Sequence, residues 1–512
     1  MRLILALLMA PALLMAQPQF VVKPGASTKI VVKLQFRNGS IADPAGKEGL
    51  TALTAALVSG GGTESQTYSD IQDQIYPMAA RYWSSTDKEV SVFTFEFHKD
   101  FSAEFQALIR DLMLKPRFDQ ADFDRIKKSH LTYVEKDVRA SSDEDYSKLA
   151  LEDFLFRGTN YQHMVMGTVP GVQSITPEDV KAHYQAVFTR NNLIVGVTGS
   201  YSESFLKQLE SDLAGLPDGK PVLPEPGKAR TPDGIQVEII TKPDAFGSAI
   251  FMGTPLSITR SSDEFAALMV ANSWLGEHRK SYSRLYQKIR ETRSMNYGDY
   301  SYIEWYESGG QYMLPPSGVP RQSNYFSIWI RPVATADNLR TNNPAEMGNV
   351  KVGHAHFAIR MALRELDLLV KNGMTEADFK ATVEFLRGYT KLYTQTPEDR
   401  IGYLLDSQFY GRVDWIQELD QLLASVTLEQ VNAAIKKHWQ TQNLFVTIVT
   451  NDKEAGPLAA ALKSNQPSPM IYKKAVAEKL PASVFEEDKQ VAVFPLNVKS
   501  VSIVPSADTF KK

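Results

Sequence analysis

The sequence predicts an α+β protein made of two tandem copies of one domain, each a mixed, mainly antiparallel sheet with helices packed on it. Three observations predict this: a repeated segment, a proline-rich stretch between the copies, and a similar order of elements in both halves. A chain of 512 residues is too long for one ordinary core. Its 43% hydrophobic and 22% charged residues are typical of a globular protein.

The repeat lies at residues 175–198 (ITPEDVKAHYQAVFTRNNLIVGVT) and 426–449 (VTLEQVNAAIKKHWQTQNLFVTIV), which align without a gap. The spacing is 251 residues throughout, as from Thr176 to Thr427. Both copies predict a helix capped by Thr, a short polar turn and a buried strand. Duplicated domains can divide their work, so the two halves can carry different chemistry.

Five prolines within residues 214–235 exclude a helix or a central strand and predict an extended linker. The first domain is therefore predicted over residues 20–213 and the second over residues 236–455, followed by a C-terminal extension at 456–512. Residues 304–324, rich in Gly and Pro, are predicted to form an irregular insertion in the second domain.

Hydrophobic patterning predicts a similar series of strands and helices in the two halves. In the first half the strands are Lys29–Phe36 and Val90–Phe97, and the helices are Gly49–Val58, Ala103–Met113, Ala121–Asp137 and Tyr146–Phe156. In the second half the strands are Val237–Thr241, Ala249–Met252 and Tyr325–Ile330, and the helices are Asp263–Leu275, His354–Lys371, Glu376–Tyr393 and Asp399–Phe409. Two further strands are predicted in the extension, at Val491–Phe494 and Val501–Val504.

Residues 1–16 (MRLILALLMAPALLMA) have an early Arg, an apolar run and a small final residue, which is the layout of a secretory signal peptide. The alternative is an apolar first strand or helix. No later stretch is apolar for the length that a membrane span needs. We therefore expect an exported protein, periplasmic or secreted, with no membrane span in its mature part.

Composition excludes several kinds of site and partner. The chain has no Cys, which rules out disulfides, thiolate metal sites and a Cys nucleophile. A net charge of −3 gives no reason to expect nucleic acid as a partner.

Residues 30–63 (IVVKLQFRNGSIADPAGKEGLTALTAALVSGGGT) resemble the N-terminal signature of the M16 zinc peptidases, the insulinase, pitrilysin and mitochondrial processing peptidase family. The resemblance covers about residues 20–455, because the repeated unit is also typical of this family. It implies tandem M16 metallopeptidase-like domains (LuxS/MPP-like) in a clam-like arrangement. In that family the helix after the Gly-Leu pair carries His-x-x-Glu-His, with two zinc ligands and the base that activates water.

Placing Gly49-Leu50 on the family's Gly-Leu pair puts the zinc motif at residues 52–56. The two ligand positions and the base position hold Ala52, Ala56 and Ala55, and alanine has no donor atom for a metal. The family's third ligand would fall near Glu135, which we interpret as a surface charge on a helix. The resemblance therefore implies a degenerate motif, with no cofactor bound by this chain.

No other His pattern replaces the motif. Glu277-His278 is interpreted as the charged end of a helix, and His354 and His356 are two residues apart, so on a helix they cannot share one ion. The other histidines are scattered singly: His98, His130, His163, His183 and His438.

Residues 281–301 (SYSRLYQKIRETRSMNYGDYS) resemble a segment of the family's C-terminal domain in which an Arg and a Tyr help to hold the substrate. The resemblance places these roles on Arg290 and Tyr297. An Arg can donate to a peptide carbonyl and a Tyr hydroxyl can stabilise an oxyanion. The alternative is a surface charge and an aromatic at the edge of the core. The neighbouring Tyr300, Tyr302, Trp305 and Tyr306 either line a peptide groove or form the buried face of a strand.

The resemblance implies a non-catalytic, zinc-less subunit of an exported M16-type metallopeptidase. Such a subunit binds and orients a peptide for a zinc-bearing His-x-x-Glu-His homologue in a heterodimer or larger assembly, with the zinc on the partner. The alternatives are a non-enzymatic binding or scaffold protein of the same fold, and an autonomous metalloendopeptidase.

Overall fold

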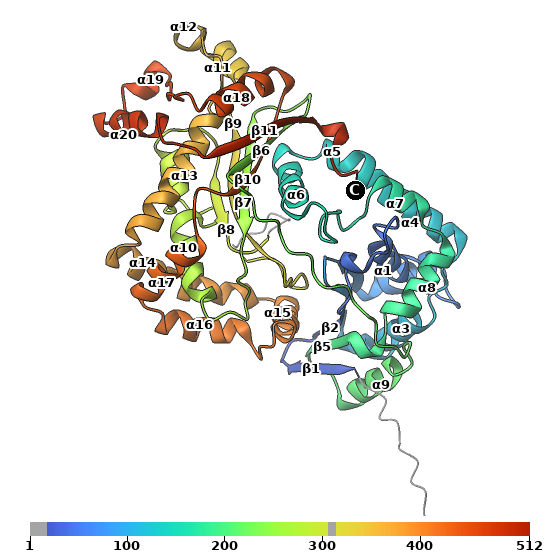
Figure 1. Cartoon of the computed structure of the whole chain (residues 1–512). Coiled ribbons are helices and arrows are strands. Elements are labelled where there is room, and N and C mark those ends of the chain that lie inside the picture. The colour runs from blue at the N-terminus through green and yellow to red at the C-terminus, as the bar shows by residue number, and fades with distance from the viewer. Residues whose placement is uncertain (1–17, 306–313, 512) are drawn as a thin grey trace, which may run out of the picture.

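The computed structural model describes residues 18–305 and 314–511 of the chain. The predicted signal peptide at residues 1–16 lies outside this part. The described residues form two halves, each with its own sheet and its own layer of helices (Figure 1). The two halves confirm the predicted α+β duplication, which the strand orders below make explicit.

The first sheet has the strand order β1-β5-β2-β4-β3. Strands β1 and β5 are parallel, and the other neighbouring pairs are antiparallel. The sheet is built from β1 (Gln19–Pro24), β2 (Lys29–Phe36), β3 (Arg81–Thr86), β4 (Ser91–His98) and β5 (Leu193–Gly199). The helices of this half are α1 (Leu50–Gly60), α2 (Tyr68–Ile75), α3 (Ser102–Leu114), α4 (Gln120–Thr132), α5 (Val138–Ala140), α6 (Asp143–Phe156), α7 (Val169–Ser174), α8 (Pro177–Val187) and α9 (Glu203–Leu213).

The second sheet repeats this order and adds one strand, giving β11-β6-β10-β7-β9-β8. Strand β10 pairs in parallel with β6 and antiparallel with β7, as β5 does with β1 and β2. The strands are β6 (Ile235–Thr241), β7 (Ser248–Pro255), β8 (Asp299–Tyr302), β9 (Tyr325–Val333), β10 (Leu444–Thr450) and β11 (Val498–Pro505). The shared strand order is the structural counterpart of the sequence repeat.

The helices of the second half cover its sheet and continue into the C-terminal extension. They are α10 (Phe265–Gly276), α11 (Ala336–Asn342), α12 (Pro344–Met347), α13 (Ala355–Asn372), α14 (Glu376–Tyr389), α15 (Pro397–Phe409), α16 (Trp415–Ser425), α17 (Leu428–His438), α18 (Asp452–Ser464), α19 (Lys474–Ala477) and α20 (Ala482–Ala492). In the described part of the chain, none of the helices combines the length and apolar character that crossing a bilayer requires.

The repeated unit has the same local chemistry in both halves. Thr176 caps α8 by accepting a hydrogen bond from the backbone N–H of Asp179, and Thr427 caps α17 in the same way with Gln430. In both helices, the side chain of the third residue after the cap, Asp179 or Gln430, accepts a hydrogen bond from the backbone N–H of the capping Thr. The two bonds satisfy two backbone donors that have no partner within the helix. The predicted Thr caps are confirmed.

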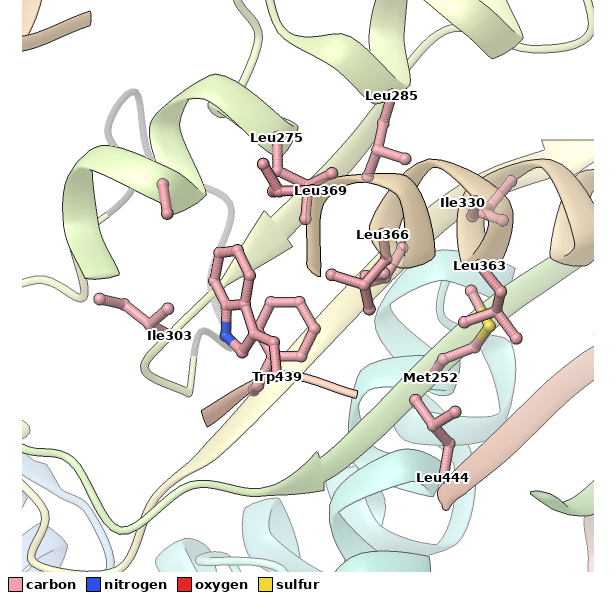
Figure 2. Close-up of a cluster of buried hydrophobic side chains, with 14 of the residues drawn as sticks. Met252, Leu275, Leu285, Ile303, Ile330, Leu363, Leu366, Leu369, Trp439 and Leu444 are labelled. Carbon is pink, nitrogen blue, oxygen red and sulfur yellow. The ribbon is translucent and has the colours of Figure 1, made fainter. Parts of the chain in front are cut away.

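The largest core lies between the second sheet and its helices. Figure 2 shows Leu363, Leu366 and Leu369 of α13, spaced by one helical turn, pointing toward side chains of the sheet such as Met252 and Ile330. Trp439, which follows α17 in the repeat, is buried in the same cluster. Burial of apolar surface on this scale is the main source of stability in a chain without disulfides.

The two halves exchange one helix each (Figure 1). Helix α6 of the first half packs on β7 and β10 of the second sheet, where Phe154 meets Phe445 with ring centroids 4.6 Å apart. Helix α15 of the second half packs on β5 and β2 of the first sheet, where Ile401 is buried against Val31. The two helices occupy equivalent positions in the two halves of the chain. The exchange is therefore reciprocal and joins the halves through two apolar interfaces.

Buried charges reinforce this joint. Arg321, near the end of the predicted insertion, forms a bidentate pair with Asp87 at 2.8 Å and a second pair with Glu152 of α6 at 2.7 Å. Its guanidinium also lies 3.5 Å from the ring centroid of Trp305. Lys88 pairs with Glu152 as well, at 3.0 Å. Breaking such a network by removing one partner costs about 3–5 kcal/mol, because the remaining charges stay buried.

The structure departs from the predicted elements in five places. Strands β1, β3 and β8 were not predicted, because they are short or only half buried and give a weak alternating pattern. The predicted strand Val491–Phe494 is wrong, because Val491 closes helix α20 with its side chain in the core. The predicted helix Ala121–Asp137 ends at Thr132 and continues as a π-helical turn. The predicted strand Val501–Val504 is confirmed as part of β11.

Candidate functional site

Helix α1 carries the positions at which the family has its zinc motif. It begins after Gly49, whose φ of 102° is a conformation that glycine adopts without strain, and packs against β3, α4 and α8. Ala52 and Ala55 are buried and Ala56 is partly buried. Ala55 belongs to the core of the first sheet, and Ala56 packs beside Phe123 and Ile126 of α4. These methyl groups are buried or partly buried among neighbouring side chains, and they have no donor atom for a metal.

Glu135, the position closest to the family's third ligand, lies on the π-helical turn Tyr133–Asp137. Its side chain is exposed, in agreement with the prediction of a surface charge. Within the residues that the structure describes, no group of three or more His, Asp or Glu side chains is placed to hold a metal ion. The side chains present on α1 do not fit the zinc site that the fold family implies.

A buried carboxylate anchors the start of α1. One oxygen of Asp43 accepts hydrogen bonds from the backbone and the hydroxyl of Thr51, at 2.7 and 2.6 Å, and the other accepts from the backbone N–H of Gly49 at 2.7 Å. His163 Nε2 lies 3.3 Å from the second oxygen, and His183 Nε2 lies 2.8 Å from the Thr51 hydroxyl. Asp43 therefore caps the helix with its side chain, although it lies seven residues before Leu50, the first residue of the helix.

The interpretation of the single histidines as scattered is wrong for two of them. His163 and His183 converge on the Asp43–Thr51 pair from different loops and helices. His130 of α4 is also buried, and burial lowers its pKa to about 4, with the charge of Asp43 acting in the opposite direction. The residues are about 90 to 140 positions from Asp43 in the sequence, so no local pattern could have joined them.

Arg290 and Tyr297 line one groove on the second half, with a volume of about 610 Å³. Arg290 stands on the π-helical turn η6 (Tyr286–Glu291), with its guanidinium 4.8 Å from the ring centroid of Tyr286 and paired with Glu291. Tyr297 is 78% exposed. Between them, Ser294 has a φ of 53°, a left-handed turn that redirects the chain from η6 toward β8.

The other lining residues of the groove are also polar and aromatic. They include Phe246, which is 82% exposed, together with Arg331, Asn338 and Asn342. Asn338 of α11 donates a hydrogen bond to the carbonyl of Phe246, which holds the loop that carries this ring. Glu291 is the one carboxylate among the lining residues, so the groove has an excess of positive charge. Its size is within the range of about 300–1,000 Å³ that is usual for ligand sites.

The base of the groove is fixed to the second sheet and to the first half. Asn296 donates to the carboxylate of Asp299 at 2.8 Å and to the carbonyl of Arg331 at 2.9 Å. Asp299 is buried, which raises its pKa well above the usual range. Arg331 pairs with Glu144, at the start of α6, at 2.8 Å. The groove therefore lies where the exchanged helix of the first half meets the second sheet.

The structure decides whether the aromatic residues that follow Tyr297 line a peptide groove or form the buried face of a strand. These residues form the inner face of a strand and not a groove, because Tyr300, Tyr302 and Trp305 are buried in or just after β8. Tyr306 lies outside the described residues.

The interpretation of Glu277-His278 as a charged helix end is wrong. Both side chains are buried after α10, and burial raises the pKa of Glu277 to about 7.

Comparisons with known proteins agree with this geometry. The family model described as "Insulinase (Peptidase family M16)" matches residues 23–169, and the model "Peptidase M16 inactive domain" matches residues 174–386. The chain is 24% identical over 428 residues to the "Non-peptidase homolog YmxG" of Helicobacter pylori, covering 83% of this chain and 89% of that protein. It is also 22% identical over 306 residues to an "Uncharacterized zinc protease" of Streptomyces coelicolor, covering 58% and 59% of the two chains.

Solved structures match the fold over most of the chain. The peptidase M16 inactive domain from Pseudomonas fluorescens gives a TM-score of 0.71 at 20% identity, covering 85% of this chain and 96% of that one. A protease from Helicobacter pylori gives a TM-score of 0.69 at 13% identity, covering 85% and 97%. The two family models span both halves, and the helix that bears the zinc motif in that family bears Ala52, Ala55 and Ala56 here. This chain therefore belongs to the M16 peptidase family, as a member without the zinc-binding residues.

Proposed function

We propose that this protein is the non-catalytic subunit of an exported M16-type metallopeptidase, and that it binds and orients a peptide for a homologue that carries His-x-x-Glu-His. The observation that carries the proposal is the contrast between the two halves. The first half has only methyl groups where the zinc ligands would be, and the second half keeps an open groove lined by Arg290 and Tyr297.

The groove suits an extended peptide. Tyr297 and Phe246 expose large aromatic surfaces at its rim, and such surfaces are common anchors in protein and peptide recognition. The guanidinium of Arg290 can donate to a peptide carbonyl, because its partner Glu291 is itself partly exposed and can be exchanged for the ligand. The hydroxyl of Tyr297 can donate to the same oxygen when negative charge develops on it.

The partner would supply the zinc ion and the water that the ion activates. This chain would supply affinity and orientation, which lower the barrier by holding the peptide bond in the reactive position. The apolar run and small final residue of residues 1–16 support export, so the partner is expected in the same compartment.

Reconstitution tests the proposal. The chain is co-expressed with an M16 homologue from the same organism that carries His-x-x-Glu-His, and cleavage of fluorescence-quenched peptides is measured with and without this chain. Arg290→Ala and Tyr297→Phe should each lower kcat/KM by about 10-fold or more, because each removes a donor from the bound peptide.

The chain offers matched controls for both substitutions. Arg110 is also partly exposed and also pairs with the next residue, Asp111, but lies on α3 of the first half. Tyr76 is 87% exposed and lies after α2. Arg110→Ala and Tyr76→Phe should leave kcat/KM unchanged. Equal rates for Arg290→Ala and wild type would refute the assigned role of the groove.

A second candidate is a binding or scaffold protein that has no part in proteolysis. The printed name of the Helicobacter pylori relative, a non-peptidase homologue, favours it. Purification of a stable assembly that contains this chain and no zinc-bearing homologue, with no stimulation of any such homologue's activity, would support the scaffold function. Stoichiometric zinc linked to activity in the purified single chain would instead support an autonomous peptidase, against the absence of ligands on α1.

A further inference from the structure

Residues 466–497 of the C-terminal extension lie against the segment that presents Arg290 and Tyr297. Helix α20 packs on α13, which is one of the helices that cover the second sheet (Figure 1). Apolar residues of both segments belong to the core of the second half, and charged side chains add specific contacts between them. Such directional contacts fix the position of a segment more specifically than apolar packing does.

Arg293 is the centre of this contact. It is three residues after Arg290, its side chain is fully buried, and it lines a second cavity beside the groove and not the groove itself. Its Nε donates to Asp488 at 2.8 Å and its Nη2 donates to Glu487 at 2.8 Å, both on α20. Its Nη1 donates to the carbonyl of Lys288 at 2.7 Å, within the π-helical turn. One guanidinium therefore joins the extension to the backbone of η6.

Neighbouring pairs extend the contact in both directions. Glu487 also accepts from Lys288 at 2.5 Å and from Arg364 of α13 at 3.4 Å. Asp488 also accepts from the hydroxyl of Tyr472 at 2.6 Å. Burial acts to raise the pKa of Glu487, but the hydrogen bonds and charges of Lys288 and Arg293 hold it at about 2. The carboxylate is therefore charged at neutral pH.

The extension also forms one side of a second cavity, of about 270 Å³, which continues the groove. The two cavities share lining residues, among them Met295, Asn338 and Asn342. The far side of the second cavity is formed by the extension itself, with Met470, Ile471, Tyr472, Lys473 and Val476.

We infer that the C-terminal extension is part of the peptide-binding site: Glu487 and Asp488 are positioning residues that act through Arg293 to hold the turn presenting Arg290 and Tyr297. The inference rests on the proposed function, because it assigns the extension to the same groove. The two carboxylates act through Arg293 and not by direct contact with a ligand, since neither of them lines the groove or the second cavity.

The competing explanation is that α20 only stabilises the second half. Two measurements on the full chain separate these explanations, using Glu487→Gln/Asp488→Asn as the clamp variant. Glu486→Gln is the matched control, because Glu486 lies on the same helix and, among the described residues, forms its ion pair with Lys489 at the surface.

The first measurement is hydrogen–deuterium exchange of the amides in residues 284–298. The clamp variant should exchange there about 10-fold faster or more, while β9 and β10 keep the wild-type rate, because only the local opening is made easier. The control variant should match wild type. Unchanged exchange in residues 284–298, or equal acceleration across the whole second half, would overturn the positioning role.

The second measurement is a double-mutant cycle on binding to a library of fluorescent decapeptides with one fixed position each. Arg290→Ala and the clamp variant should each weaken binding by about 10-fold, and their combination should be little weaker than Arg290→Ala alone, because coupled residues are not additive. Additive losses would contradict action through Arg290. If the wild-type chain binds none of the peptides, the proposed function fails, whereas the exchange rates still decide whether α20 holds this turn.

Discussion

Helix α1 and the turn around Arg290 lie in different halves of a duplicated fold and have opposite characters. On α1, the positions of the family's metal ligands hold small side chains that are buried or partly buried in the packing of the first half. Around Arg290, large side chains are exposed and are held in place by α11, by α6 and by the C-terminal extension. The first arrangement contributes to the packing of the first half. The second exposes aromatic surface, which contributes little to folding and supports the proposal that the groove binds a ligand.

The first prediction concerns the anchor of α1. Asp43→Ala leaves the N–H groups of Gly49 and Thr51 without their acceptor in a buried site. The free energy of unfolding should fall by about 2–4 kcal/mol, as for other buried charge-assisted hydrogen bonds. Asp73→Ala, at an exposed position on α2, should change it by less than about 0.5 kcal/mol. Urea unfolding measures both, and a neutral Asp43→Ala would show that α1 needs no such anchor.

The second prediction concerns the pH dependence of stability, and it again tests the first half, in which His130 lies. The pKa of His130 is about 4 in the folded protein and close to 6.5 when unfolded. Between these values the unfolded chain binds more protons, so the contribution of His130 to stability is present above pH 6.5 and is lost as the pH falls toward 4.

His130→Leu removes this loss. Relative to wild type, the variant should gain on the order of 2 kcal/mol between pH 7 and pH 5. Unfolding curves of the two proteins at these two pH values measure the difference. Parallel pH dependences would contradict the buried, neutral state of His130.

The third prediction tries to reverse the difference between the regions. Ala52→His/Ala55→Glu/Ala56→His restores the motif's residue types but inserts bulk at two buried positions. The triple variant should lose about 1–3 kcal/mol of stability from overpacking. Because Glu135 remains exposed, the variant should bind zinc weakly and show no peptidase activity alone. Tight zinc binding with turnover would show that the substituted alanines are the only defect.

The fourth prediction has the smallest effect on folding. Tyr297→Phe removes a hydroxyl from a side chain that is 78% exposed, so the free energy of unfolding should stay within about 0.5 kcal/mol of wild type. Peptide binding or turnover with the partner should nevertheless fall. Loss of stability in this variant would mean that Tyr297 supports the fold and is not free for a ligand.

Local patterns in the sequence were sufficient for much of the fold. The strand β2, the helix α1 and the repeated helix–turn–strand unit each follow from hydrophobic spacing and capping residues within a short window. The loss of the zinc motif could be predicted from the identities of three residues alone, Ala52, Ala55 and Ala56. These features depend on neighbours in the sequence, where single-sequence reasoning is strongest.

The features that the sequence did not reveal depend on distant residues. Asp43 meets His163 and His183 only after folding, and Arg293 meets Glu487 and Asp488 across about 195 residues. The exchange of α6 and α15 between the sheets reverses the expectation that each helix covers its own half. Val491 was predicted to lie in a strand because β-branched residues favour strands. In the structure it lies in helix α20, where tertiary packing overrides this preference.

The rate of peptide cleavage by the zinc-bearing homologue, measured in the presence of this chain, decides whether the second half holds the substrate. We expect the wild-type chain to raise kcat/KM, Arg290→Ala to abolish most of this gain, and Arg110→Ala to keep it. Cleavage at the same rate with wild type, with Arg290→Ala and without this chain would contradict the claim that the second half holds the substrate.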